Sequence, residues 1–454
     1  MKININNIGI IEDASLKLNG LTVITGYNNS GKTTVGKVIY SLFTSIENLG
    51  AHILEDQKKY VINNLNQLWR DVYMEITNVN KGEVDNFFRV NVINRMNVIK
   101  KAEDIQHVND LLSDFLSNLR EILGKLYSDR ADELFIEKKY IEFKDAIENI
   151  QQIVNTSFLK DAYIDDKFER TLKEEFVGQI LPVNKEGIIG QITLEKSEKK
   201  VLDYKIQNNS IIDRYNSLDD MKIDKEVVFL DNVFLLDELS EKNRDKTRWF
   251  IIDDENTNIS IKRHKEKLLD EIKEKKSNNS TIIDNILNKE KLDRIISKIS
   301  KTFDDEIIIA NDEIYSSNSK VYIENLAMGS KVFAILKLLL SKGIINEKTV
   351  LVLDEPEVHL HPEWQSILAE ILALMIKELG VVVVLTTHSP QFLLALEYYM
   401  NMYKQKDMFN VYMTEDKITK SVTYREVTEN IQEAYYRLSK PMFDIKNNID
   451  KLKE

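Results

Sequence analysis

The chain has 454 residues, of which 43% are hydrophobic and 30% are charged, a composition typical of a soluble globular protein with two to three domains. Its formal net charge of −12 excludes a global basic field, so any contact with nucleic acid needs a local basic patch. The absence of cysteine excludes disulfides and cysteine-ligated metal centres and fits a reducing cytoplasm. The N-terminus lacks the apolar core of a signal peptide, and the most apolar stretch, residues 371–385, is too charged to span a bilayer. We therefore expect a cytoplasmic protein without a membrane partner.

Residues 1–25 are expected to form short strands, since apolar and polar residues alternate there and Asn19-Gly20 marks a turn. The last of these strands leads into residues 26–33, which read GYNNSGKT and fit the phosphate-loop pattern G-x-x-x-x-G-K-[ST] at every fixed position. A helix is expected to follow, as far as about Phe43. Lys32 supplies a charge for the β and γ phosphates and Thr33 a hydroxyl for Mg²⁺. The pattern predicts an ATP–Mg²⁺ site formed by Gly26, Asn28, Asn29, Ser30, Gly31, Lys32, Thr33 and Thr34.

The middle of the chain shows no catalytic cluster. A helical pattern without proline extends from about residue 45 to 176, strand-like alternation occupies residues 188–212, and a short apolar run lies at 227–230. Residues 262–300 form a mixed-charge helical pattern that is interrupted at 275–280. That pattern fits a helical hairpin projecting from a globular head, or equally a helix pair packed on the head.

Aliphatic strands return from Glu306 onward and are separated by helical runs. Strands are expected at residues 307–309, 321–323, 350–353 and 381–385. Continuous aliphatic strands of this kind indicate a parallel sheet that is covered on both faces.

Polar residues follow two of these strands directly. The strand at 350–353 ends in Asp354-Glu355, and parallel strands deliver such residues to the edge of the sheet where a phosphate loop also lies. We expect Asp354 to hold Mg²⁺ through its water shell and Glu355 to orient and deprotonate the attacking water. His388 follows the strand at 381–385 and is expected to reach the γ-phosphate.

A short loop between these two motifs contains Glu357, His359 and His361. These residues are compatible with a metal site, but a turn that faces a partner subunit is the simpler interpretation.

Four motifs occur in the order found in ABC-type ATPases, namely residues 26–33, 325–331, 353–362 and 387–390. Within that class the chain resembles the SMC/RecF/OLD branch, in particular stand-alone anti-phage defence ATPases such as PtuA of Septu and abortive-infection or retron-associated ATPases. The resemblance covers residues 1–45 and 306–454 well, and the middle only by layout. It implies an α/β fold, an ABC-type P-loop ATPase head with a mixed sheet and flanking helices, split by a large mainly helical insertion.

The resemblance also implies an order of domains. We expect an N-terminal part of the head at 1–45, a helical insertion at 46–180, a β-rich segment rejoining the head at 181–235, a helical arm or hairpin at 236–305, and the C-terminal part of the head at 306–454.

By the same resemblance, residues 325–331 form the signature motif that completes the ATP site of a second protomer, with Asn325, Ala327 and Gly329 as contacts. Ala327 stands where the family usually has a serine that bonds the γ-phosphate. Losing one such bond is worth about 1.5–3 kcal/mol, so turnover is expected to be slow. The Q-loop glutamine stays open among Gln151, Gln152, Gln179 and Gln191.

The function implied is that of an ATP-hydrolysing sensor or regulatory subunit in a bacterial anti-phage complex, abortive-infection or toxin–antitoxin-like, which forms homodimers or larger assemblies and holds a separate nuclease or toxin. No nuclease is expected in this chain, because the strand pair near 409–424 and the helix from Thr428 are too little for the Toprim domain of OLD nucleases and Asp253-Asp254-Glu255 matches no nuclease arrangement. The alternatives are a RecF- or SMC-like DNA-repair ATPase whose insertion binds DNA, and an ATP-stabilised binding scaffold with little turnover.

Overall fold

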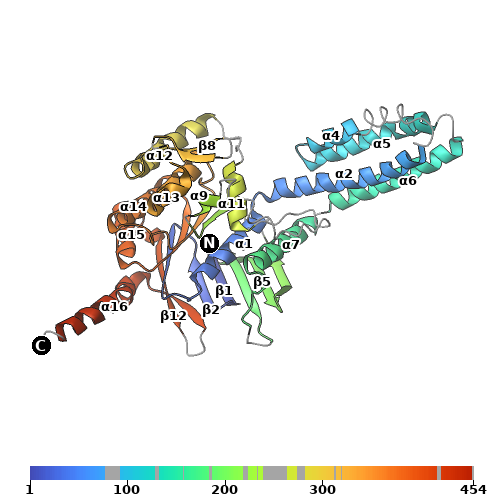
Figure 1. Ribbon diagram of the computed structural model, residues 1–454. Coiled ribbons are helices and arrows are strands. Elements are labelled where there is room, and N and C mark those ends of the chain that lie inside the picture. Colours follow the sequence, from blue (N-terminus) through green and yellow to red (C-terminus); the bar gives the residue numbers. More distant parts are fainter. Residues whose placement is uncertain are drawn as a thin grey trace. The chain divides into compact units, whose positions relative to one another are not determined.

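The structure is a computed structural model (Figure 1) that describes residues 1–76, 93–127, 132–156, 158–183, 187–217, 223–232, 234–238, 263–273, 282–310, 313–318, 320–416 and 421–451. The chain divides into a head, Met1–Glu47 with Asp166–Glu454, and an inserted unit, Asn48–Asp165. The finer division expected at 180, 235 and 305 stays a prediction. The acidic cluster Asp253-Asp254-Glu255 and the helix interruption at 275–280 lie outside the described residues.

One mixed sheet forms the centre of the head. Within the described residues its eleven strands lie in the order β6 (Ser210–Asn216), β5 (Lys199–Gln207), β4 (Gly190–Lys196), β1 (Lys2–Ile8), β2 (Ile11–Lys17), β13 (Val422–Glu426), β12 (Phe409–Asp416), β3 (Leu21–Thr25), β11 (Val382–Thr387), β10 (Thr349–Asp354) and β7 (Glu226–Leu230). The five strands from β12 to β7 are parallel, whereas β1, β2, β4, β5 and β6 pair antiparallel. The carboxyl ends of β3, β11 and β10 therefore meet at one edge.

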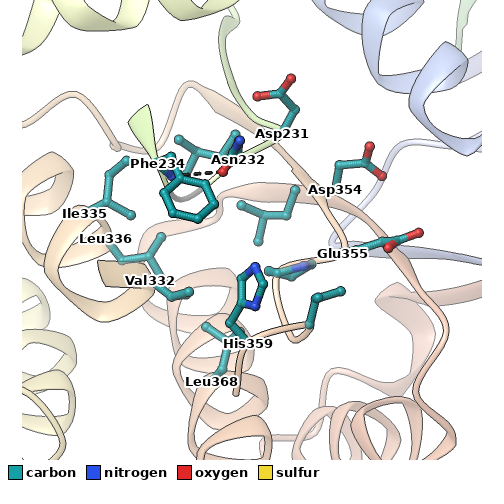
Figure 2. Close-up of a pocket in the computed structure, with 14 residues that line it drawn as sticks. Asp231, Asn232, Phe234, Val332, Ile335, Leu336, Asp354, Glu355, His359 and Leu368 are labelled. Carbon is teal, nitrogen blue, oxygen red and sulfur yellow. Dashed lines mark hydrogen bonds between the residues drawn. The ribbon is translucent and has the colours of Figure 1, made fainter. Parts of the chain in front are cut away.

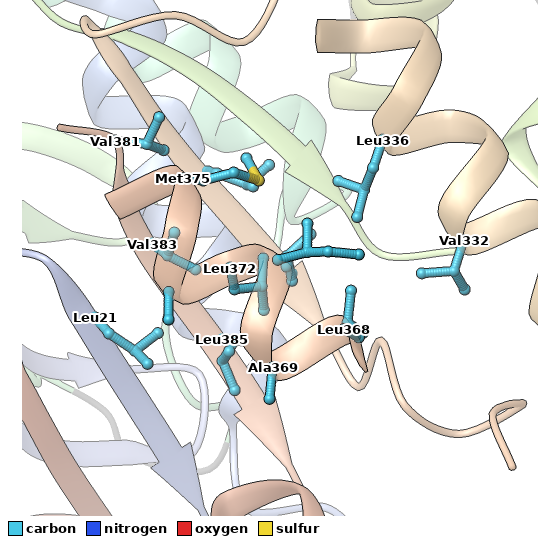
Figure 3. Packing of buried hydrophobic residues seen from close by; sticks show 14 of the residues in the cluster. Leu21, Val332, Leu336, Leu368, Ala369, Leu372, Met375, Val381, Val383 and Leu385 are labelled. Carbon is cyan, nitrogen blue, oxygen red and sulfur yellow. The ribbon is translucent and has the colours of Figure 1, made fainter. Parts of the chain in front are cut away.

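Helices cover both faces of the parallel strands, as their uninterrupted burial requires. On one face, helix α1 (Lys32–Ile46) packs on β7 and β10 so closely that a Cβ on Gly36 would lie 2.8 Å from Phe229 Cζ. On the other face, Leu21, Val383 and Leu385 meet the buried side of α14 (Pro362–Leu379), as Figure 3 shows. Helices α13 (Met328–Ser341) and α15 (Pro390–Met402) complete this core.

Two further helices pack on the head. Leu268 and Ile272 of α11 (His264–Lys273) and Ile295 and Ile299 of α12 (Ile282–Ser300) belong to the same buried core. Of the two arrangements that the sequence left open for residues 262–300, the described parts adopt the packed helix pair. The smaller elements of the head are α9 (Leu235–Glu238), the β8–β9 hairpin (Ile307–Ala310 and Glu313–Ser316) and the 3-10 turns η5 (Lys406–Met408) and η6 (Thr428–Asn430).

The strand expected at residues 321–323 is wrong. Tyr322 makes a single bridge to Tyr315, and the 3-10 turn η4 (Ile323–Asn325) begins at the next residue. The preceding Lys320 has a left-handed backbone (φ 51°). The chain therefore turns sharply and enters α13 before a third strand can pair, although its three residues are β-branched or aromatic.

The inserted unit is helical, with α2 (Leu49–Ile76), α4 (Asn94–Lys100), α5 (Ile105–Tyr127) and α6 (Glu133–Val154). Its core centres on Trp69, whose ring lies 5.9 Å from that of Phe115 and 4.9 Å from that of Phe143. The unit owes its own core to these helical faces, since buried side chains recur along α5 at helical spacing.

Helix α7 (Phe158–Glu175) leads back into the head, and α16 (Ile431–Lys451) is the last described helix. None of the helices in the described ranges combines the length and the apolar character needed to cross a bilayer.

Candidate functional site

The phosphate loop connects β3 to α1 and is closely packed against side chains of β12 and β13. A Cβ on Gly26 would lie 1.7 Å from Thr414 Oγ1 of β12, so only glycine fits there. Gly31 has a left-handed backbone (φ 76°) and is the N-cap of α1. The hydroxyl of Tyr424 donates to the carbonyl oxygen of Ser30 at 3.0 Å. The loop thus ends at the start of α1, where the first backbone N–H groups have no partner within the helix, and such a helix start suits an anion.

The side chain of Lys32 is buried at the base of the loop. Its Nζ donates to the carbonyl of Tyr27 at 3.0 Å and lies 2.7 Å from His388 Nε2 and 3.7 Å from Glu355 Oε1. Burial lowers the pKa of Lys32, while the neighbouring carboxylates oppose that shift. A buried ammonium group of this kind is stabilised by further anionic charge, such as that of a phosphate.

Asp354, at the end of β10, joins the loop to β11. Thr33 Oγ1 donates to Asp354 Oδ2 at 2.5 Å, and Thr386 Oγ1 donates to Asp354 Oδ1 at 2.5 Å. A hydroxyl and a carboxylate side by side provide the hard oxygen ligands that Mg²⁺ prefers. The two predicted metal residues are therefore together and fit the ion chemically. When bound, the ion would neutralise phosphate charge.

Glu355 has an unusual backbone. Its φ is 48°, a left-handed conformation that is rare for a residue other than glycine and is found preferentially at functional sites. Its N–H donates to Thr386 Oγ1 at 3.0 Å, and its Oε1 lies 2.9 Å from His388 Nε2. This turn directs the carboxylate toward Lys32 and His388 instead of along the strand.

The backbone of His388 is fixed by a hydrogen bond to the buried side chain of Glu357. Glu357 Oε1 accepts hydrogen bonds from Thr387 Oγ1 (2.5 Å) and from the backbone N–H of His388 (3.1 Å). Burial raises the pKa of Glu357. Burial and the nearby Lys32 charge lower the pKa of His388. A neutral imidazole results, whose Nε2 can accept from Lys32 or donate to Glu355, but not both at once.

The sequence reading missed Asp231 and Asn232, which follow β7. Because β7 is the neighbour of β10, these residues arrive at the same edge as Asp354. The signal was present, since the apolar run 227–230 ends in two polar residues just as 350–353 does. Of the four glutamines left open for the Q-loop, Gln151 and Gln152 are on α6, Gln179 follows α7, and Gln191 is on β4, and the assignment stays open.

These two residues border a cavity of about 280 Å³ (Figure 2). Acidic groups of the strand ends lie at one side, and apolar side chains of α13 and α14 form the other. The lining comprises Leu230, Asp231, Asn232, Phe234, Val332, Ile335, Leu336, Leu353, Asp354, Glu355, Pro356, Val358, His359 and Leu368.

Asp231 also contacts a buried histidine of α11. His264 Nε2 lies 3.2 Å from Asp231 Oδ2, and its Nδ1 lies 2.9 Å from Glu175 Oε2 at the end of α7. Burial alone would lower the pKa of His264, but the two carboxylates outweigh burial and raise it. Helices α7 and α11 are thus tied electrostatically to the end of β7.

Residues 1–393 match the family model described as an AAA ATPase domain. The chain belongs to this family. Among curated proteins, none matches this sequence. The family and the sheet confirm the expected fold, an α/β P-loop ATPase head with a mixed sheet and flanking helices.

Solved structures of SMC head domains align along almost the whole chain. The SMC head bound to the C-winged helix domain of ScpA has 10% sequence identity and a TM-score of 0.39, with 95% of this chain and 98% of that chain covered. The SMC head domain from Thermotoga maritima has 10% identity and a TM-score of 0.36, with 94% and 98% covered.

The residues predicted to form a signature motif lie at the start of α13. Ala327 is the N-cap and makes no side-chain capping bond. Gly329 is buried, and a Cβ there would lie 3.1 Å from the Trp364 ring. Asn325 and Ala327 are exposed. They belong to η4 and α13, whereas the phosphate loop lies between β3 and α1, so their role in nucleotide binding stays a prediction.

The remaining predicted loop residues differ in exposure. Asn28 and Asn29 are exposed, and Thr34 is half-buried. In the loop after β10, Glu357 is buried against Thr387, whereas His359 and His361 are exposed. His361 Nδ1 accepts from the N–H of Glu363 and caps α14. Among the residues that the structure describes, no group of three or more histidine or acidic side chains is arranged to hold a metal ion.

Proposed function

We propose that this chain binds ATP with Mg²⁺ and hydrolyses it, and that Glu355 activates the attacking water. One observation carries the proposal. Lys32 Nζ, His388 Nε2 and Glu355 Oε1 come from three separate elements and lie within 2.7–3.7 Å of one another. A cation for the phosphates and a base for the attacking water are groups that phosphoryl transfer to water uses, and the imidazole lies within hydrogen-bond reach of both.

Each group has a distinct part. The N–H groups at the start of α1 and Lys32 hold the phosphates, and Thr33 with Asp354 would hold the ion. Glu355, 33% exposed, accepts the proton of the water. When Lys32 turns to a phosphate, His388 Nε2 is released from it and donates to Glu355 or to the γ-phosphate. The buried Glu357 keeps His388 in place through its backbone N–H.

Turnover measurements test this proposal. Lys32→Ala should abolish binding of ATP, and Glu355→Gln should retain binding while lowering turnover about 10²–10⁴-fold, the usual contribution of a general base. Glu347→Gln is the matched control, because it removes the same charge from an exposed residue outside the site. Turnover by Glu355→Gln equal to that of Glu347→Gln would contradict the assignment.

We further propose that two copies share their nucleotide sites through the start of α13. The exposure of Asn325 and Ala327 and the free N–H groups of the helix support it, since a helix start attracts a γ-phosphate. Sedimentation of Glu355→Gln with ATP should give a dimer, and a further Gly329→Arg substitution should return it to the monomer. A dimer that forms without ATP and persists in the Gly329→Arg variant would refute the shared site.

The cellular role that we propose is that of a sensor or regulatory subunit in an anti-phage defence complex, which holds a separate nuclease or toxin. The support is the resemblance of the motifs at 26–33, 353–362 and 387–390 to defence ATPases. Native mass of tagged Glu355→Gln, purified from its own cells with ATP, tests it. A nuclease or toxin at fixed stoichiometry supports the role. Bound DNA alone would instead favour the DNA-repair alternative, and a protein that keeps ATP without turnover would favour the scaffold.

A further inference from the structure

Helix α16 carries one row of apolar side chains along its length. The row consists of Ile431, Tyr435, Leu438, Met442, Ile445 and Ile449. Successive members are four and three residues apart in strict alternation, and the sequence repeats the interval at Leu452. A mean spacing of 3.5 residues keeps a row on one side of a helix and is the repeat of coiled coils.

The head covers only the first half of this row. Ile431 is 7% exposed, and Tyr435 and Leu438 pack against the main core. In contrast, Met442, Ile445 and Ile449 are 66%, 61% and 46% exposed, and every residue from 440 to 451 is exposed. Figure 1 shows α16 extending away from the sheet. The second half therefore presents an apolar seam with the same spacing and no cover within the described chain.

The charges beside the seam favour a protein helix as its occupant. Residues 440–451 contain three lysines and two aspartates, whereas helices that bind membranes or nucleic acid present a strongly basic face. The positions that flank the seam are Ser439, Pro441, Lys446 and Asn448. Because only one of these four residues is charged, two identical helices can approach each other without strong electrostatic repulsion.

The N-terminal part of α16 lies beside the phosphate loop. Arg437 Nη1 donates to the carbonyl of Thr414 at 2.6 Å, and its guanidinium carbon lies 4.7 Å from the centre of the Tyr27 ring. Tyr27, His388 and Arg437 also line a cavity of about 180 Å³. If two copies assemble around ATP, as proposed above, the second copy already lies near this helix. This choice of occupant, but not the seam itself, rests on the proposed function.

We propose that residues 440–451 of α16 pair with the same segment of a second copy of this chain in a short coiled coil. The contact is isologous, since one self-complementary seam serves both partners. Three large side chains per helix fall well short of the roughly 1,200 Å² of a standard stable interface. The pairing is therefore weak alone, and it adds to any other contact that holds two copies together.

Cysteine cross-linking tests the pairing, because the chain contains no cysteine of its own. Ile445→Cys and Ile449→Cys place single thiols on the seam, and Asn447→Cys places one on the opposite, exposed side of the same helix. A disulfide needs Cα atoms within about 7 Å. Mild oxidation should therefore give covalent dimer from at least one seam variant and only background from Asn447→Cys. Equal yields from all three would overturn the proposal.

A charge substitution separates this pairing from the shared nucleotide site. Ile445→Glu should remove the cross-link formed through Ile449→Cys, whereas Asn447→Glu should leave it unchanged. Both side chains are exposed, so the fold and the turnover of ATP should persist in each. If turnover is lost in Lys32→Ala but the cross-link remains, the pairing stands without the shared site. Binding of the seam to phosphatidylserine vesicles or to another protein, without any seam cross-link, would overturn self-pairing.

Discussion

Glu357 offers a sharp test of how the site is held, because two of its hydrogen bonds can be removed or kept by choice of substitution. In Glu357→Ala, the Thr387 hydroxyl and the His388 N–H lose their acceptor in a buried place. An unsatisfied buried donor costs about 1–3 kcal/mol. Two such donors, of which the hydroxyl can rotate, therefore lower the free energy of unfolding of the head by about 2–4 kcal/mol.

Glu357→Gln keeps the acceptor oxygen and imitates the protonated acid, whose second oxygen has no hydrogen-bond partner. Because burial raises the pKa of Glu357 in the folded head, the folded state binds more protons than the unfolded state above pH of about 4.3, the ordinary glutamate value. The wild-type head must then lose stability as pH rises toward the folded pKa, by at most about 1.4 kcal/mol per pH unit from this group. The glutamine variant lacks this loss.

Urea unfolding of the wild type and both variants between pH 4 and 8 measures these effects. The stability of Glu357→Gln relative to the wild type should grow with pH and then level off, and Glu357→Ala should be the least stable throughout. The reasoning would be refuted if glutamine destabilised the head as much as alanine, or if the difference between glutamine and wild type were independent of pH.

Three further outcomes are expected. His264→Gln should destabilise the head more at pH 6 than at pH 9 in urea unfolding, because the raised pKa of His264 gives stability that is complete below about 6.5 and is lost as pH rises through the folded value. Ala327→Ser should raise the free energy of unfolding, measured in urea, by about 1 kcal/mol, because serine can cap α13. ATP turnover should rise as well, and unchanged turnover would show that the residue at 327 does not contribute to catalysis. Gly36→Ala should cost about 1–3 kcal/mol through overpacking against Phe229, and Phe229→Leu in the same chain should recover part of that loss in thermal unfolding.

The central site was predictable because three motifs each follow a buried aliphatic strand. Parallel strands bring their carboxyl ends to one edge, so Lys32, Asp354 and His388 could be placed together without coordinates. Asp231 was missed because the short apolar run 227–230 was not linked to the other strands, and only the structure shows that this strand is the neighbour of β10. The burial of Glu357 depends on Thr387, thirty residues away, and no local pattern reveals such a pair.

The pairing register of strands that are far apart in the chain could not be predicted from the sequence either. Strand β1 pairs with β4, where Ile5 lies opposite Ile192, and nothing in either heptapeptide specifies the other. In contrast, local signals mark the starts of α1 and α14, since a glycine turn precedes α1 and a proline occupies the first position of α14. Tyr322 shows the opposite failure, since strand-forming residues were overridden by the left-handed turn at Lys320.

The position of β3 has a consequence for synthesis of the chain. This wholly buried strand, residues 21–25, lies between β11 and β12, whose residues begin at 382 and 409. At the usual ribosomal rate of about 5–20 residues per second, its neighbours emerge roughly 20–70 s later. During that time the inserted unit can fold on its own core, but the apolar edge of β3 has no native partner. The nascent head should therefore depend on chaperones, and moving the first 47 residues behind the rest by circular permutation should shorten that dependence.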